Sequence, residues 1–237
     1  ILETEMYEVA EKTEVLENVP VMMSLFQDYI VGMTGKRENI LHLVRNMIFQ
    51  LTSDHSYDDV KIVIVVDKNE AEYFDFVRYL PHNWDDERNI RFFVTSQSEA
   101  QQLTSHFNKI KDNRDESVSY NITNEEAYIV FDLSKSLFNY IETFKEVIKS
   151  EKYEGISIIA AFEGLPKECV KVIDLDNNFK IIDYLHPETE DQFFALDEFD
   201  ERLAKAAVSQ IVETKVRMDC NSFMLPKMIT FLEMFGV

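Results

Sequence analysis

The sequence has little of the residues that mark several common protein classes. Glycine and proline occur five times each in 237 residues, and 46% of the chain is apolar, which excludes a disordered or collagen-like chain. The two cysteines, Cys169 and Cys220, lie far apart without a CxxC or Cys/His spacing, and no two histidines have a metal-ligand spacing. We therefore expect reduced, buried thiols and no metal site. A GxSxG motif is also absent, so no nucleophile for covalent catalysis is predicted.

Long apolar runs are lacking as well. None of them approaches the length needed to cross a bilayer, and the first residues lack the basic and apolar regions of a signal peptide. We therefore expect a soluble segment. The chain begins ILETEMYEV without an initiator methionine, which indicates a piece of a longer protein.

Positive charge is scarce, with 24 Lys and Arg against 44 Asp and Glu and a formal net charge of -20. This balance excludes a nucleic-acid partner, because phosphate contacts demand a basic face. The acidic residues gather at 185–201. Such a cluster is usually a solvated face, and the functional interpretation is an electrostatic docking patch for a basic partner.

The stretch from residue 28 to residue 51 organises the rest of the chain. It begins with a short apolar strand at 29–31, and Gly32 and Gly35 supply the freedom of a sharp turn. An amphipathic helix follows, because apolar residues recur at spacings of three and four. This apolar face comprises Ile40, Leu41, Val44, Ile48 and Leu51. Strand, glycine turn and helix in this order are the layout of a phosphate-binding loop.

The match to a phosphate-binding loop is incomplete. A working loop reads GxxxxGK[ST], whereas GMTGKR shortens the glycine spacing and places Arg37 where a hydroxyl should hold Mg²⁺. One interpretation is a turn that only joins a strand to its helix. The other is weak nucleotide or anion binding by a vestigial site, whose residues would be Gly32, Thr34, Gly35, Lys36 and Arg37.

Apolar strands alternate with helices over the middle of the chain. The predicted strands are 60–66, 89–95, 127–132 and 155–162, and the predicted helices are 67–80, 96–110 and 135–150, with an exposed loop at 111–126. Asp67 or Asn69 is expected to cap the first of these helices, and Ser96 or Ser98 the second. The pattern predicts an α/β fold with a mainly parallel sheet and helices on both faces.

The pattern changes after residue 165. Apolar runs at 169–175 and 179–184 flank the turn residues 176–178 and predict a hairpin at the sheet edge. An acidic loop, a helix over 198–215 and an apolar end at 225–237 complete the chain. We predict one domain over residues 1–237, whose parts are a leading segment (1–27), an α/β core (28–165) and a hairpin with C-terminal helices (166–237). The leading segment either adds an edge strand or packs across the sheet.

His82 and the chain's one tryptophan, Trp84, lie in one short loop. They are candidates for a contact site, because tryptophan offers a large apolar area with a polar edge. The structural interpretation, which we favour, is that Trp84 plugs the end of the core while His82 bonds to the loop backbone.

Four separated stretches carry a resemblance to a known family. They are DYIVGMTGKRENILHLVRNMIFQLTSDHSYDDVKIV, RYLPHNWDDERNIRFF, GLPKECVKVI and FLEMFGV. Together they resemble the FtsK/SpoIIIE-type ATPases of the type VIIb secretion systems of Gram-positive bacteria, and the resemblance spans nearly the whole chain.

The resemblance implies a RecA-like, P-loop-ATPase-like core of degenerate sequence, located between membrane-spanning helices and tandem ATPase domains. The strand AYIVFD then matches a Walker B strand, but Asp132 is followed by Leu133 where a second acid is required, and Asp67 is followed by Lys68. With no catalytic residues and no cofactor expected here, ATP and Mg²⁺ belong to the other domains.

The function implied is a non-catalytic domain on the cytoplasmic side of the bacterial membrane that couples the membrane channel to the downstream ATPase domains. The implied partners are those domains, other secretion membrane components, secreted proteins and further copies of the chain. Two alternatives stay open: a nucleotide-binding regulatory or ATP-hydrolysing domain, and a docking module for secreted substrates or other secretion components.

Overall fold

The computed structural model describes residues 19–116, 126–150 and 155–214. The predictions for residues 1–18 and 225–237, and for Cys220, fall outside the described residues. Over the described residues no helix has the length and apolar character that crossing a membrane requires.

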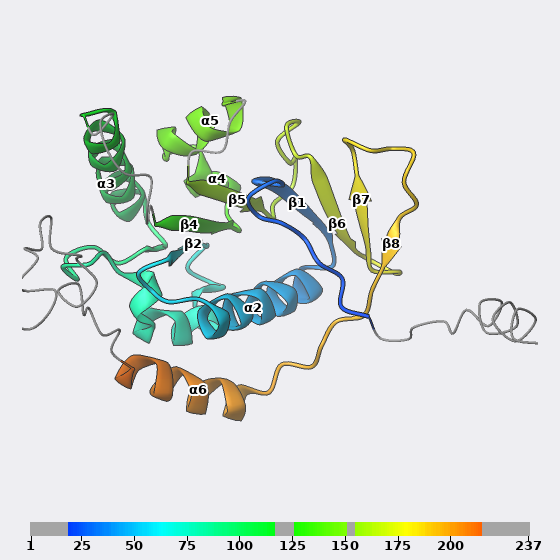
Figure 1. The fold of residues 1–237 in the computed structure, drawn as a ribbon, viewed down its shortest axis with the longest axis horizontal. Helices are drawn as coiled ribbons and strands as arrows, with labels where there is room; N and C mark the ends of the chain where they lie inside the picture. The colour runs from blue at the N-terminus through cyan, green and yellow to red at the C-terminus, as the bar shows by residue number, and fades with distance from the viewer. Residues whose placement is uncertain (1–18, 117–125, 151–154, 215–237) are drawn as a thin grey trace, which may run out of the picture.

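One eight-stranded sheet runs through the described chain in the order β3-β2-β4-β5-β1-β6-β7-β8 (Figure 1). Its first six strands are mutually parallel, and β7 and β8 are antiparallel additions. The predicted, mainly parallel sheet is therefore confirmed. The strands are β1 (Ile30–Gly35), β2 (Val60–Val65), β3 (Phe93–Val94), β4 (Ala127–Asp132), β5 (Ile156–Ala160), β6 (Lys171–Leu175), β7 (Lys180–Asp183) and β8 (Gln192–Phe193).

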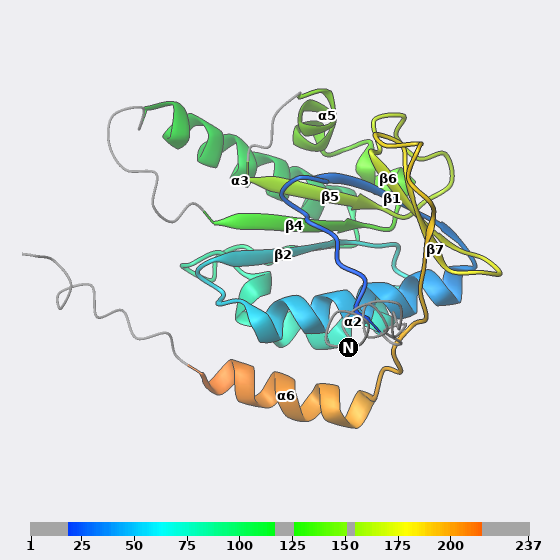
Figure 2. The same cartoon turned by 45° about the vertical axis from the view of Figure 1, so that its right-hand side comes forward.

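Helices cover both faces of the sheet, as predicted (Figures 1 and 2). One face carries α2 (Arg37–Asp54), the 3₁₀ helix η1 (Ala71–Tyr79) and, outside them, α6 (Glu201–Glu213). The other face carries α3 (Gln97–Glu116), α4 (Lys135–Phe138) and α5 (Glu142–Lys149). A further 3₁₀ turn, η2 (Pro81–Asn83), follows η1.

Each face of the sheet has its own core, because successive strand residues point to opposite sides. Val31 of β1 packs on the α2 side, and its neighbour Ile30 packs on the α3 side. Every residue of β2 is buried, as expected for a strand inside a parallel sheet that is covered twice. The predicted apolar face of α2 is also confirmed, although Leu51 is only partly buried.

The helix predicted over 67–80 is shorter and of another type. It begins at Ala71 and is a 3₁₀ helix with a kink at Phe74. Neither Asp67 nor Asn69 caps it, because the residue at its start is Glu70 and no side chain bonds to the first turn. The acidic side chains in this connection bind other partners at the sheet edge. The helix predicted over 135–150 is likewise divided into α4 and α5.

Other boundaries also differ from the prediction. The strand at 89–95 is reduced to β3, while α3 continues to Glu116, into the segment predicted as a loop. The hairpin of β6 and β7 is confirmed, but β6 also pairs with β1 and so continues the parallel sheet. The acidic loop contains a short strand, β8. Residues 19–29 form no strand and pack across the sheet through Met23 and Leu25.

The two glycines of the predicted turn have different roles. Gly32 lies inside β1 rather than in the turn, and it is required there for close packing, since an added Cβ would lie 2.5 Å from Leu165 Cδ1. Gly35 ends the strand with φ +112°, and its Cβ would lie 2.4 Å from the backbone carbon of Leu175 in β6. Only Lys36 separates Gly35 from α2.

We predict that Gly35→Ala destabilises the fold by at least about 2 kcal/mol, because strained backbone and overpacking each cost 1–3 kcal/mol. Gly164→Ala is the matched control. Gly164 also has a positive φ of +78°, but its added Cβ would meet only the mobile Lys135 ammonium, at 2.7 Å. Urea unfolding of both variants tests the difference, and equal losses would contradict the close approach of β1 to β6.

Candidate functional site

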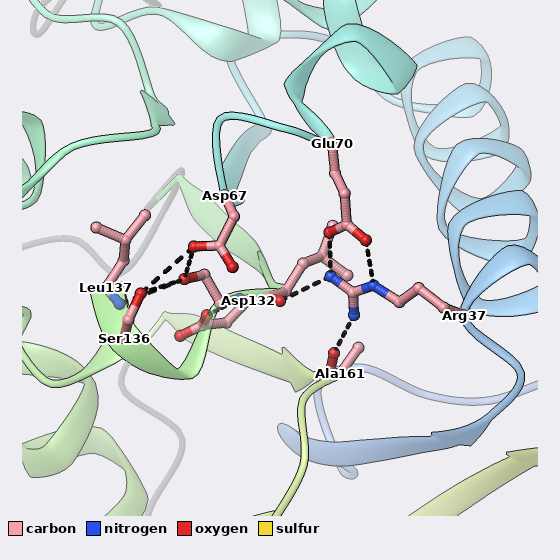
Figure 3. Close-up of polar contacts among 9 residues, drawn as sticks. Arg37, Asp67, Glu70, Asp132, Ser136, Leu137 and Ala161 are labelled. Carbon is pink, nitrogen blue, oxygen red and sulfur yellow. Dashed lines mark hydrogen bonds and ion pairs between the residues drawn. The ribbon is translucent and has the colours of Figure 1, made fainter.

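The predicted site lies at the carboxyl edge of the sheet, where β1, β5, β4 and β2 end side by side. The carboxyl ends of parallel strands lie at one edge of the sheet, and α/β proteins bind their ligands at this edge. The connections that leave these four strands carry charged and hydroxyl side chains that contact one another across the edge (Figure 3).

Arg37, the first residue of α2, joins all four strand ends. Its guanidinium forms a bidentate pair with Glu70, in which Nε donates to Oε1 at 2.8 Å and Nη2 donates to Oε2. Nη2 also donates to the carbonyl oxygen of Leu133 at 2.8 Å, and Nη1 to that of Ala161 at 2.6 Å. Glu70 follows β2, Leu133 follows β4 and Ala161 follows β5. We call Arg37 and Glu70 with these two carbonyls the arginine clamp (Figure 3).

Asp132 ends β4 next to the clamp and is completely buried. Its Oδ1 accepts a hydrogen bond from the Ser134 backbone N–H at 3.2 Å, while Oδ2 has no hydrogen-bond partner. Burial, aided by the nearby Asp67 charge, raises the pKa of the Asp132 carboxyl well above its ordinary value, although the Ser134 N–H opposes this shift. Burial therefore makes the charged form of this carboxyl less favourable than it is in an exposed aspartate.

Asp67 lies on the side of Asp132 that faces away from the arginine clamp, and its carboxylate accepts hydrogen bonds from two hydroxyls. Its Oδ1 accepts hydrogen bonds from the hydroxyls of Ser134, at 2.5 Å, and Ser136, at 3.3 Å. Within the described residues no group of three or more His, Cys, Asp or Glu side chains is placed to hold a metal ion.

Gly32 is buried inside β1, whereas the other residues of the predicted phosphate loop lie at the surface. Thr34, Gly35 and Lys36 are exposed, and Lys36 has extended backbone angles of φ -65° and ψ 129°. A strand that passes into its helix through one residue leaves little backbone to wrap an anion. Of the predicted nucleotide-site residues, the structure thus brings Arg37 alone into contact with the polar groups near Asp132.

His82 and Trp84 make their polar contacts away from this edge, and each bonds to a different backbone carbonyl. His82 is 1% exposed, and its Nε2 lies 2.9 Å from the carbonyl oxygen of His55. Burial lowers the pKa of His82, although the bond to that carbonyl opposes the shift. Trp84 is partly buried and donates from Nε1 to the carbonyl oxygen of Arg78 at 3.2 Å, while the Arg91 guanidinium lies 4.3 Å from its ring centroid. Both side chains thus make contacts of a structural kind.

Two further polar groups lie outside the predicted site residues. Glu70 falls in a segment predicted as helix, although its position shortly after a buried strand places it at the carboxyl edge. Lys61 is a lysine inside an apolar strand and is 2% exposed, and its ammonium lies 2.7 Å from Asp86 and 3.4 Å from Glu126. A lysine at a fully buried strand position requires carboxylate partners. The lysine within VKIVIV therefore indicates a buried ion pair, but the sequence does not identify the carboxylates that pair with it.

Comparison with known proteins gives the relationship. No protein-family model matches the chain. The type VII secretion system protein EssC of Staphylococcus aureus (strain NCTC 8325) is 27% identical over 218 residues, which cover 87% of this chain. The chain is homologous to EssC. It spans about 15% of the length of that EssC relative.

Solved structures of EssC and EccC share the fold. ATPases 2 and 3 of EssC from Geobacillus thermodenitrificans align with a TM-score of 0.57 and 12% identity, covering 79% of this chain and 44% of that one. ATPases 2 and 3 of EccC from Thermomonospora curvata, in complex with a signal sequence peptide, align with a TM-score of 0.55 and 11% identity, covering 82% and 44%. The RecA-like α/β fold expected from the sequence is therefore confirmed.

We predict that Arg37→Lys destabilises the protein by about 2–4 kcal/mol, because lysine cannot make a bidentate pair and leaves Glu70 or a strand-end carbonyl unpaired. Arg45→Lys, on the same helix, is the matched control and should cost about 1 kcal/mol or less. Arg45 pairs at 3.0 Å with the exposed Glu201 and lies over the Phe199 ring. Thermal and urea unfolding measure both. A loss for Arg37→Lys no larger than the control would show that the clamp is not needed.

Proposed function

We propose that this EssC homologue is a non-catalytic, ATPase-derived domain that couples its neighbours in a type VII secretion protein. The observation that carries the proposal is the arginine clamp. In a working phosphate loop the residues at the start of the helix hold phosphate, whereas Arg37 holds the Glu70 carboxylate. The chain thus supplies its own anion beside the start of α2. The buried Asp132, with its raised pKa and no second acid after it, supports the same proposal.

The leading segment is firmly attached to the sheet, as a coupling role requires. Ser157 in β5 donates to the carbonyl oxygen of Leu25 at 2.6 Å. Asp28 is 5% exposed, and its Oδ2 accepts from the Lys171 ammonium in β6 at 2.8 Å. Lys171 also lies 3.6 Å from Asp183 in β7. A displacement of residues 19–28 would therefore act directly on β5, β6 and β7.

The trailing segment, residues 194–214, packs against the core cluster on the α2 side, which Met23 and Leu25 of the leading segment also contact. Val208 of α6 joins the cluster formed by α2 and η1, and the Asp197 carbonyl oxygen lies 2.7 Å from His42 Nε2 and 2.8 Å from Asn46 Nδ2 of α2. The leading and trailing segments thus meet through α2 and β1. We propose that strain passes between them by this route, with the membrane side before residue 19 and the ATPase domains after residue 214.

The proposed partners follow from this position. They are the ATPase domains of the same protein, other membrane components of the secretion system, further copies of the chain and secreted proteins, all on the cytoplasmic side of the membrane. Binding of secreted proteins is supported by the EccC neighbour, which was solved with a signal sequence peptide. The other candidate function, regulation by a bound nucleotide, depends on the exposed Lys36 and the start of α2.

The first prediction of this role is that isothermal titration with ATP and Mg²⁺ gives no binding tighter than about 0.1 mM. The reason is that Arg37 is already paired with Glu70 and that no second acid follows Asp132. Lys36→Ala should leave any residual heat unchanged. A micromolar affinity that Lys36→Ala abolishes would favour the nucleotide-binding alternative instead.

The second prediction is that Lys171→Met, introduced into the full secretion protein, reduces substrate secretion by roughly tenfold, since a buried carboxylate loses its partner and the leading segment loosens. Lys111→Met is the control. Lys111 pairs with Glu146 at 3.0 Å, but both side chains are more than half exposed, and such pairs contribute little. Protein level and membrane insertion are monitored by immunoblot. Equal secretion by both variants would count against coupling through Asp28 and Lys171.

A further inference from the structure

The last two strands of the sheet, β7 and β8, are covered on one side only. On the α2 side, residues 19–25 cross them, and Met22 and Met23 line a groove with Ile181, Asp183 and Gln192. On the other side, α3, α4 and α5 extend over β2 to β5, and none of them lies over β7 or β8 (Figure 1). Within the described chain this side of β7 and β8 has no helical layer.

The strand register identifies the side chains on the uncovered face. Because Ile181 and Asp183 line the groove on the α2 side, alternation places Ile182 and Tyr184 on the opposite face. Gln192 lines the same groove, so Phe193 also points to the opposite face. The pairing of β7 with β8 aligns Phe193 with Lys180, two residues before Ile182. Ile182 of β7, Tyr184 directly after β7 and Phe193 of β8 therefore lie on one face, since the Tyr184 N–H continues the pairing by bonding to the carbonyl oxygen of Val170.

This face is apolar but exposed. The exposed fraction is 60% for Tyr184 and 64% for Phe193, and Ile182 is partly exposed. Val172 of β6, on the same face, is buried beneath the connection that holds Leu165 and Cys169. The apolar surface thus begins where this connection ends and continues to the free edge of β8.

Negative charge borders the apolar face. From residue 174 to residue 191 the chain has six carboxylates and one lysine. That lysine, Lys180, is paired with Asp191 at 2.7 Å, and this pair lies within the face. Asp174 is the strand partner of Lys180 on the same face, and Asp176 and Glu188 lie in the connections beside it, whereas Asp183 and Glu190 line the groove on the α2 side. A partner for this surface needs an apolar side and positive charge beside it.

We propose that the face formed by Ile182, Tyr184 and Phe193 is a docking site for an amphipathic helix of another protein, with lysine or arginine flanking its apolar side. A helix is the expected form, because helices cover the neighbouring strands of the same sheet face. A second copy of the chain fits poorly, since its net charge of -20 would bring like charges together. The inference does not depend on the coupling role.

The test uses a fluorescent 18-residue helical peptide of leucine and lysine, with its leucines on one side, and measures anisotropy against the whole chain. We expect Tyr184→Ser/Phe193→Ser to weaken binding roughly tenfold. The matched control is Tyr79→Ser/Leu203→Ser, which removes two apolar side chains that are 70% and 67% exposed elsewhere. Binding by the control should stay within about twofold of the wild type. Equal weakening by the two variants, or none by the first, overturns the proposal.

Charge is tested separately. Asp176→Lys/Glu188→Lys should weaken peptide binding more than Asp54→Lys/Glu72→Lys, which reverses two exposed charges on the α2 side. A leucine–glutamate peptide of the same length should not bind. Two other results would overturn the proposal. One is a dimer in sedimentation equilibrium that Tyr184→Ser/Phe193→Ser dissociates, because a second copy of the chain would then cover the face. The other is peptide binding that appears only after residues 215–237 are removed, because that part of the chain would then cover the face.

Discussion

A single guanidinium holds together the edge at which the sheet would bind a ligand. Arg37 bonds to the residue that directly follows each of two strands, to Glu70 in the connection after a third, and begins the helix that follows a fourth. These four strands are neighbours in the sheet. The carbonyls of Leu133 and Ala161 project from strand ends, where the ladder no longer supplies a donor. Arginine suits this position because its donors lie in one plane and diverge, so it can bind a carboxylate and two carbonyls at once.

The clamp also explains why the connection after β2 departs from its predicted form. The sequence there is acidic and was expected to start a helix with a capping aspartate. Instead, Asp67 bonds to Ser134 and Ser136, and Glu70 bonds to Arg37, so neither side chain turns back to the helix amides. The following segment forms a kinked 3₁₀ helix. Contacts between distant parts of the chain have prevailed over a local capping preference here.

The backbone architecture was largely predictable, whereas the site was not. Strands such as β2 and β4 are buried on both faces, and that environment leaves a direct mark on the sequence as an apolar run. Short strands at the ends of the sheet have no clear apolar pattern in the sequence. For that reason the strand predicted over 89–95 is longer than β3, and β8 is not predicted at all. Side-chain pairs are harder still, because Arg37 and Glu70 are 33 residues apart and Lys61 and Asp86 are 25 apart. The sequence shows that such charges need partners, but it does not show which ones.

The Glu70 carboxylate is a fixed negative charge beside the start of α2, and it differs from a bound phosphate in its effect on movement. A phosphate that enters and leaves an ATPase core supplies both the energy and the signal for movement, because its charge is present in one state and absent in the other. The Glu70 carboxylate is present in every state of the protein. On the proposed role, the clamp therefore keeps the edge in one arrangement, and the domain transmits force between the segments joined to α2 rather than generating it. A rigid element suits that task, since the carboxylate that closes the edge also keeps the four strand ends together.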